Sequence, residues 1–339
     1  MAQSTARRIF GRLPDGRAVE SIRLQGDGLS AEVLTWGAVI RDLRFDGHAP
    51  PLVLGLNSIG DYLAHSRNFG ASPGRCANRI AQGRFTLDGR DYALERNERG
   101  GRNHIHGGSQ GMARALWRVL DLGADRLVLG IEDPAGNAGY PGTVWTECTI
   151  ALRAAALCIR YASRCDAPTP VNICHHGYFN LGHGPDVRDH LLRIEAARYL
   201  PVDADKIPRG GPQPVEGTGF DLRRETALAE RLVQLPEGYD HNFCLSDTAR
   251  PLRPVAWAHA PGGLELELAT TEPGVQLFTA GALDCPVPGL DGRRYGPAAG
   301  FCLETQIWPD AVNQPGFPPV VLRPGEVRVQ DSEYRFSSA

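Results

Sequence analysis

Apolar and polar residues alternate with a period of two through much of the chain. Between residues 143 and 152, Cys148 and Ile150 share one parity, and Glu147 and Thr149 take the other. Residues 264–268 read Leu-Glu-Leu-Glu-Leu, and residues 157–161 repeat the alternation. Because successive side chains of a strand point to opposite faces, this pattern predicts β-strands with one buried face.

Turn residues separate these runs at short intervals. Glycine and proline account for 40 and 26 of the 339 residues, and an Asp88-Gly89 step between two alternating pieces predicts a β-hairpin over residues 85–94. Helical patterns are few: residues 58–64, with Ser58 as a candidate N-cap, and the less regular residues 112–120. The chain is therefore predicted to be an all-β protein.

The punctuated pattern continues along the chain without an internal repeat, a low-complexity tract or a break in composition. Residues 1–339 are therefore expected to form a single domain, a large antiparallel β-structure. Stacking or closing the sheets would bury one face of each strand, so a β-sandwich and a barrel are both open at this point.

Charge and hydropathy limit the kinds of molecule that the protein is expected to bind. The formal net charge is -3, and no basic run is interleaved with aromatic residues, so neither nucleic acid nor an anionic membrane surface is expected to bind. The N-terminal residues contain no apolar signal segment, and no stretch of about 18 apolar residues occurs. A cytoplasmic protein, a monomer or weak dimer, with a small polar ligand is predicted.

Two residue types argue against covalent or disulfide chemistry. The eight cysteines are scattered without a C-x-x-C pair, which predicts buried free thiols. The only lysine, Lys206, lies in a loop-like segment, so a Schiff-base mechanism is not expected.

A carboxylate follows the apolar run of residues 301–303. Glu304 is predicted to lie where this buried strand emerges, because Pro309 and further prolines after it prevent continued pairing. Burial can raise the basicity of such a carboxylate, as a general base requires. A capped or salt-bridged strand end is the alternative.

The stretch of residues 103–108 contains two histidines, His104 and His106. On an extended segment both would point the same way, as in a metal site, but position 110 is a glutamine and no carboxylate follows nearby, so a metal is not expected. A nucleophile elbow at Ser109 would need a strand and a helix in a parallel α/β sheet, which the pattern does not predict. Close backbone approach explains Gly107 and Gly108 better.

Three further groups can carry chemistry. Asn78 and Arg79 beside a glycine turn can donate to hydroxyl oxygens, although such a pair is common in loops. Of the adjacent His175 and His176, at most one can face a pocket, since neighbouring strand residues face opposite sides; a core histidine is the alternative. Asp240 lies in an aromatic-flanked turn, and together with Glu304 it would also meet the requirement of a glycoside hydrolase.

Taken in order, these blocks and several others resemble the aldose 1-epimerase (galactose mutarotase) family over about residues 30–330. The matching blocks are residues 34–40 (LTWGAVI), 77–80 (ANRI), 103–108 (NHIHGG), 176–181 (HGYFNL), 219–223 (GFDLR), 239–243 (YDHNF), 276–279 (QLFT), 303–306 (LETQ), 313–315 (NQP) and 322–326 (LRPGE). The resemblance implies a single-domain β-supersandwich that interconverts the α and β anomers of a free hexose or pentose without a metal or cofactor.

The resemblance also implies roles for individual residues. Glu304 resembles the family's general base, which takes the proton of the C1 hydroxyl, and His176 resembles the general acid that protonates the ring oxygen. The family positions that bind the sugar are matched by Asn78, Arg79, His106, Asp240 and Gln276. A non-catalytic sugar-binding protein on the same fold and a glycoside hydrolase remain as alternatives.

The chain departs from the family pattern at three places. His175 stands where the family commonly has asparagine, Gly177 stands where it has serine or threonine, and residues 279–282 read Thr-Ala-Gly-Ala. The acid and base are retained, so the expected consequence is for substrate preference, and galactose is not assumed.

Overall fold

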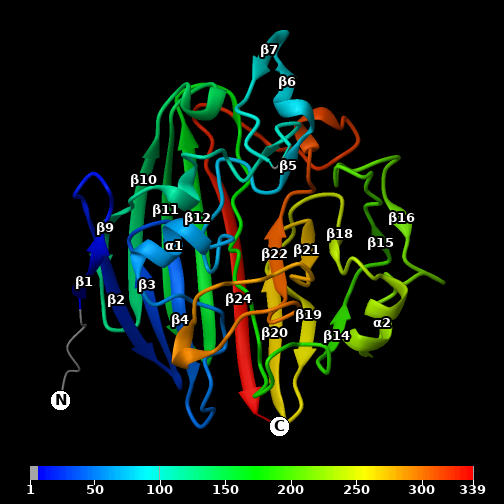
Figure 1. Ribbon diagram of the computed structural model, residues 1–339. Helices are drawn as coiled ribbons and strands as arrows, with labels where there is room; N and C mark the ends of the chain where they lie inside the picture. The colour runs from blue at the N-terminus through cyan, green and yellow to red at the C-terminus, as the bar shows by residue number, and fades with distance from the viewer. Residues whose placement is uncertain (1–6, 99, 339) are drawn as a thin grey trace.

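The computed structural model describes residues 7–98 and 100–338. Its largest element is a nine-stranded antiparallel sheet, with the long strand β24 near the middle of the view in Figure 1. The strands of this sheet are, in order across it, β17 (Thr226–Ala227), β14 (Leu191–Ile194), β19 (Arg253–His259), β20 (Leu264–Thr270), β24 (Arg328–Ser338), β12 (Ala156–Cys165), β11 (Val144–Arg153), β10 (Arg126–Asp133) and β9 (Arg118–Leu122).

Two smaller antiparallel sheets accompany it. The four-stranded sheet comprises β1 (Arg7–Arg12), β2 (Ala18–Gly26), β3 (Leu29–Leu34) and β4 (Val39–Phe45). The five-stranded sheet comprises β16 (Gln213–Pro214), β15 (Arg198–Tyr199), β18 (Asp240–Cys244), β21 (Gly274–Phe278) and β22 (Cys302–Gln306). Between them, Phe179 forms isolated bridges to Val53, which follows β4 in the chain, and to Phe301, which precedes β22.

One large cluster of buried apolar side chains joins all three sheets. It includes Val33 of β3, Ile150 of β11, Leu266 of β20 and Leu303 of β22. The predicted alternation is confirmed, since Leu266 is fully buried while its neighbour Glu265 is exposed. The fold is thus an antiparallel β-sandwich, as predicted, and burial of one face of each strand supplies its main stabilisation.

Short elements complete the fold. Three two-stranded pairs are β5 (Arg79–Ile80) with β8 (His104–Ile105), β6 (Arg84–Leu87) with β7 (Arg90–Ala93), and β13 (Thr169–Pro170) with β23 (Val321–Leu322). The helices are α1 (Ile59–His65) and α2 (Leu228–Gln234), with 3₁₀ turns at Ala81–Gly83, Met112–Arg114, Asn137–Gly139, Leu290–Gly292 and Ala311–Asn313.

Two of the predicted local signals are confirmed. Asp88 and Gly89 both have positive φ, 50° and 76°, in the turn between β6 and β7, as a two-residue hairpin loop requires. Ser58 caps α1, since its side chain accepts a hydrogen bond of 3.1 Å from the backbone N–H of Asp61.

The helix considered for residues 112–120 is wrong. Only Met112–Arg114 form a 3₁₀ turn, and the strand β9 begins at Arg118. Pairing with another segment overrides the local pattern: Leu116 forms a bridge with Trp36, and the N–H of Trp117 donates to the carbonyl of Thr35 at 2.7 Å. Tertiary pairing of this kind routinely overrides weak helix propensity.

The cysteines are free thiols, as predicted, and all are buried except the half-buried Cys158. Among the residues described, neither helix is long and apolar enough to cross a membrane.

Candidate active site

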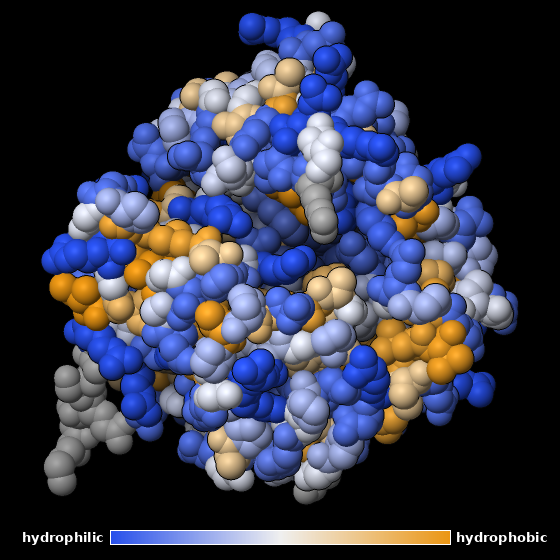
Figure 2. Space-filling view, viewed as in Figure 1, coloured by the Kyte–Doolittle hydropathy of each residue, from blue (hydrophilic) through white to orange (hydrophobic). Residues whose placement is uncertain are grey.

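A pocket of about 320 Å³ collects most of the predicted site residues, a size typical of small-molecule sites. Its lining comprises Arg67, Asn68, Asn78, Arg79, Asn97, Glu98, Ile105, His106, His176, Tyr178, Asp240, Phe278 and Glu304. In the space-filling view, the middle of the face shown is hollowed and its walls are mainly hydrophilic (Figure 2). A polar lining of this kind suits a ligand rich in hydroxyl groups.

Glu304 lies in the middle of β22 rather than at the end of a strand. Its register partner is Gln276 of β21, and the pairing continues as far as Gln306. The predicted strand end at Glu304 was therefore wrong, because the ladder extends two residues further before the prolines interrupt it. As a result the carboxyl group is held by a regular, buried strand and is only 2% exposed.

Burial dominates the ionisation of Glu304. It raises the pKa of this carboxyl from 4.5 to about 8, although the Cys174 thiol and the charge of Arg79 favour the ionised form and Asp240 opposes it. A carboxyl group taken out of water is a stronger base than one on the surface.

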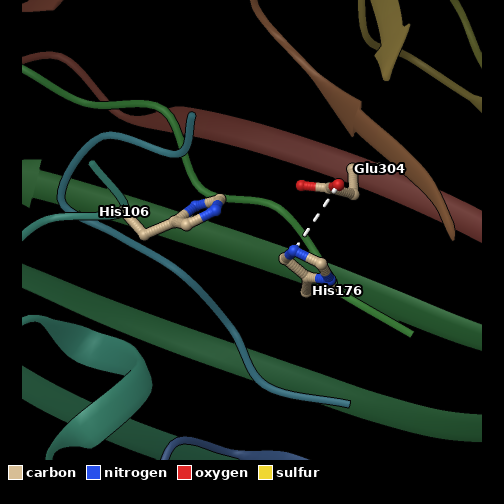
Figure 3. Close-up of side chains that lie close together, drawn as sticks. All are labelled: His106, His176 and Glu304. Atoms are coloured by element: carbon tan, nitrogen blue, oxygen red, sulfur yellow. Dashed lines mark ion pairs between the residues drawn. The ribbon is translucent and has the colours of Figure 1, made fainter. Parts of the chain in front are cut away.

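His176 contacts this carboxyl group directly. Its Nε2 lies 3.6 Å from Oε1 of Glu304 (Figure 3), and its ring stacks on Tyr178 with a centroid distance of 5.0 Å. Burial lowers the pKa of His176 to about 4. With one pKa raised and the other lowered, the pair holds a single proton at neutral pH, and it lies on Glu304 in the free protein.

The neighbouring His175 faces away from the pocket, as the parity argument predicted. Its ring is buried beside Phe179 and Tyr334, with centroid distances of 6.4 and 5.8 Å. Neither this residue nor residues 279–282 lines the pocket. The departures from the family pattern therefore lie outside the wall that a ligand would touch.

His106 points its ring toward His176 and Glu304 (Figure 3), with its centroid 5.3 Å from that of His176. The backbone N–H of Asn78 donates to Nδ1 of His106 at 3.2 Å. Since Nδ1 accepts this bond, the proton of the neutral imidazole is carried by Nε2. His106 is therefore a hydrogen-bond donor, and burial, the largest cause, holds its pKa well below the usual value.

The expectation that His104 and His106 point the same way was wrong. His106 has a φ of 51°, so the chain turns after β8 and is not extended there. The ring of His104 is instead buried between the carbonyl of Glu95, at 2.7 Å, and the hydroxyl of Tyr140, at 2.8 Å. Gly107 is required by close approach, because a Cβ atom there would lie 1.7 Å from the carbonyl oxygen of Gly74.

A different trio has the residue types of a metal site. Ligand-type atoms of His106, His176 and Glu304 lie within 4.8 Å of one another. A histidine ligand must offer an unprotonated nitrogen and usually donates through the other. His106 does the opposite, because its Nδ1 already accepts from Asn78. The tautomer fits donation to an oxygen of a ligand and does not fit a metal ion.

Hydrogen bonds and ion pairs join the other predicted site residues, together with Glu98, into one network. Asp240 accepts from Nε2 of Gln276 at 2.7 Å and is paired with Arg79 at 3.4 Å. Arg79 also pairs with Glu98 at 2.6 Å, and Oδ1 of Asn78 accepts from the backbone N–H of Arg79 at 2.9 Å. These bonds fix a carboxylate and a guanidinium in the wall, where they can accept from and donate to hydroxyl groups.

Of the seven predicted site residues, six line the pocket and Gln276 lies behind Asp240. The sequence reasoning missed several of the lining residues. Tyr178 and Phe278 carried a usable signal, because each lies two positions after a selected residue and so shares its side of an extended segment. Arg67 and Glu98 lie in irregular segments, where no periodicity marks them.

The chain is similar to known proteins over nearly its whole length. The sequence model of the aldose 1-epimerase family matches residues 20–335. The chain is 43% identical to the galactose mutarotase of Rattus norvegicus over 99% of both chains. It is 33% identical to the aldose 1-epimerase of Escherichia coli over 95% of this chain and 96% of that one. A solved aldose epimerase homologue from C. elegans superposes with a TM-score of 0.88 at 27% identity, covering 95% of this chain and all of the other.

Proposed function

The chain belongs to the aldose 1-epimerase family and interconverts the α and β anomers of a free aldose, and we propose that Glu304 and His176 are its catalytic base and acid. The observation that carries the assignment is the contact of 3.6 Å between Oε1 of Glu304 and Nε2 of His176 in a buried part of the pocket. A base and an acid in one place are what ring opening needs.

The proton moves through the pair as follows. Glu304, as a carboxylate, takes the proton of the C1 hydroxyl, and His176, as an imidazolium, gives its proton to the ring oxygen. The bond between C1 and the ring oxygen breaks, and the open aldehyde rotates about the C1–C2 bond. On closure, neutral His176 takes the proton of the attacking hydroxyl and the Glu304 carboxyl returns its proton to the aldehyde oxygen.

The pair therefore carries one proton at every stage, and only its location changes. The raised pKa of Glu304 and the lowered pKa of His176 support this scheme. In the free enzyme these pKa values place the proton on Glu304, so the neutral pair is the more stable one and binding of the sugar has to shift the proton to His176. Transfer through the sugar in either direction then keeps the total at one proton, as a reaction that runs both ways requires.

The other lining residues hold the sugar. The Nε2–H of His106 is placed to donate to an oxygen near the reacting carbon, while Asn78, Arg79 and Asp240 bind further hydroxyl groups. Gln276 acts through Asp240, whose carboxylate it holds. The proposed substrate is a free hexose or pentose, because the wall offers both donors and acceptors.

The proposal also covers the domain organisation, the location and the oligomeric state of the protein. Residues 1–339 form a single domain, which is supported by one buried cluster that draws on all three sheets. The protein acts in the cytoplasm as a monomer or weak dimer; the mildly acidic net charge of -3 is compatible with both.

Polarimetry on freshly dissolved α-D-galactose, α-D-glucose, α-D-xylose and L-arabinose tests the assignment. The wild type should exceed the spontaneous rate and rank the sugars, whereas Glu304→Gln should match the spontaneous rate. Glu147→Gln, in an exposed position of β11, is the matched control and should behave as wild type. Full activity of Glu304→Gln would overturn the assignment, and release of sugar from a nitrophenyl glycoside would indicate a hydrolase instead.

A further inference from the structure

The base has a hydrogen-bond partner that the mechanism does not use. The thiol of Cys174 donates to Oε2 of Glu304 at 3.3 Å, while Oε1 faces His176. Among the hydrogen bonds of the described residues, this is the only one that a side chain or backbone group makes to the Glu304 carboxyl group. We propose that Cys174 is a positioning residue, which orients Glu304 and sets its strength as a base.

The proposal rests on the catalytic role of Glu304 and on the placement of Cys174 beside it. Cys174 lies two residues before His176 on one extended segment, so both side chains face the same side. The backbone at Cys174 is fixed, since its N–H donates to the carbonyl of Pro73 at 3.3 Å and its own carbonyl accepts from the Tyr161 hydroxyl at 3.4 Å. A single segment therefore presents the acid and also the group that holds the base.

A thiol has a particular effect in this place. It is a weak donor compared with a hydroxyl, so it can fix the rotation of a carboxylate while stabilising the ionised form only slightly. Burial raises the pKa of the Cys174 thiol well above its usual value, so it stays protonated and remains a donor. The base is oriented, and its pKa is lowered by less than a hydroxyl donor would lower it.

The other ionisable groups around Glu304 act differently. Arg79 and Asp240 influence it through their charges, whereas His176, which is neutral near pH 7, lies 3.6 Å from its Oε1. The Cys302 thiol lies 3.6 Å from Nδ1 of His176, and the Tyr334 hydroxyl donates to the carbonyl of Leu303. The remaining neighbours with ionisable side chains are His106 and Tyr178. Cys174 is thus the group whose removal alters the hydrogen bonding of the carboxylate directly.

The pH dependence of kcat/KM in Cys174→Ala and Cys174→Ser tests this role. Losing the donor destabilises the carboxylate and raises the pKa of Glu304. Since such a bond contributes about 1 kcal/mol, the alkaline limb of Cys174→Ala should move up by about half a pH unit or more. Its kcat should fall several-fold because the carboxyl group is no longer oriented. Cys174→Ser restores a donor, so its alkaline limb should lie at or below the wild-type position.

Cys148→Ala is the matched control, because Cys148 is an equally buried thiol in β11 outside the pocket. It should lower the melting temperature and leave the pH profile unchanged. An unchanged alkaline limb in a folded Cys174→Ala protein would overturn the proposal. If the alkaline limb of Cys174→Ala is unchanged but Glu304→Gln is inactive in the same assay, the role of Cys174 is refuted and the assignment of Glu304 as the base stands.

Discussion

A Cβ atom at position 177 would lie 2.6 Å from Nε2 of His175. The imidazole of His175 is buried, and neither of its nitrogens has a hydrogen-bond partner among the described residues. His175 and Gly177 both depart from the family pattern, and the two departures are explained by packing. The imidazole ring of His175 fills the space beside Gly177, which has no side chain. This explains both departures without involving the sugar.

Gly177→Ala should then destabilise the protein by about 1–3 kcal/mol, the usual effect of overpacking, because the His175 ring is confined by Phe179 and Tyr334. Replacing His175 by asparagine removes the atom that the new Cβ meets. Urea unfolding of the wild type, both single variants and the double variant measures the coupling. Free energies that add within about 0.5 kcal/mol would show that the two positions are independent.

The acid–base pair should give kcat/KM a bell-shaped pH dependence. Below about pH 4 His176 in the free enzyme takes up a proton while Glu304 is still protonated, so no base is left. Above about pH 8 the pair loses its single proton, so no acid is left. Activity should be highest between these limits. The test is polarimetry across this range with the spontaneous and buffer-catalysed rates subtracted.

A profile without an alkaline limb up to pH 10 would contradict the single-proton pair. The Glu147→Gln control should show the same limbs as wild type, since that residue is exposed and does not line the pocket.

Glu304 should lower the stability of the fold at neutral pH. Its pKa is about 8 in the folded protein, against an ordinary value of 4.5 in an unfolded chain. Between these values the unfolded chain has released the proton and the folded protein retains it, so rising pH favours unfolding. Glu304→Gln removes this dependence and should be more stable by about 3 kcal/mol at pH 7, at about 1.36 kcal/mol per pH unit.

Urea unfolding of both proteins at several pH values between 4 and 8 measures this difference. The two stability curves should meet near the acid end and diverge as the pH rises. Parallel curves would show that the carboxyl group is not held in its protonated form by the fold.

More of the fold than of the site could be predicted from the sequence. Alternation in residues 264–268 predicted which face is buried, because a period of two is a local property of a strand. The position of Glu304 within its strand was not predictable in this way. Pairing with β21 decides where β22 ends, and that partner lies far away in the sequence.

The directions of His104 and His106 could not be predicted from the sequence either, because they depend on a single backbone dihedral angle. The turn at His106, with a φ of 51°, separates it from His104 and brings it to His176, a residue distant in the sequence. The order of the motifs could suggest that His106, His176 and Glu304 lie in one site, because members of a family share one fold and place matching motifs at matching positions. The tautomer of His106 depends on one backbone N–H, that of Asn78, a residue that the turn brings close and that no periodicity in the sequence relates to His106.

Gln276 provides a test of the network behind the pocket wall. Its Nε2 donates to Oδ1 of Asp240 at 2.7 Å, and its own carbonyl oxygen has no hydrogen-bond partner among the described residues. Gln276→Met keeps the approximate shape and removes the donor, so Asp240 should lose its fixed orientation. We expect KM to rise about tenfold, as for loss of one hydrogen bond to a charged group, and kcat to change little. A fall in kcat with unchanged KM would instead mean that Gln276 supports Glu304, its register partner, more than it supports Asp240.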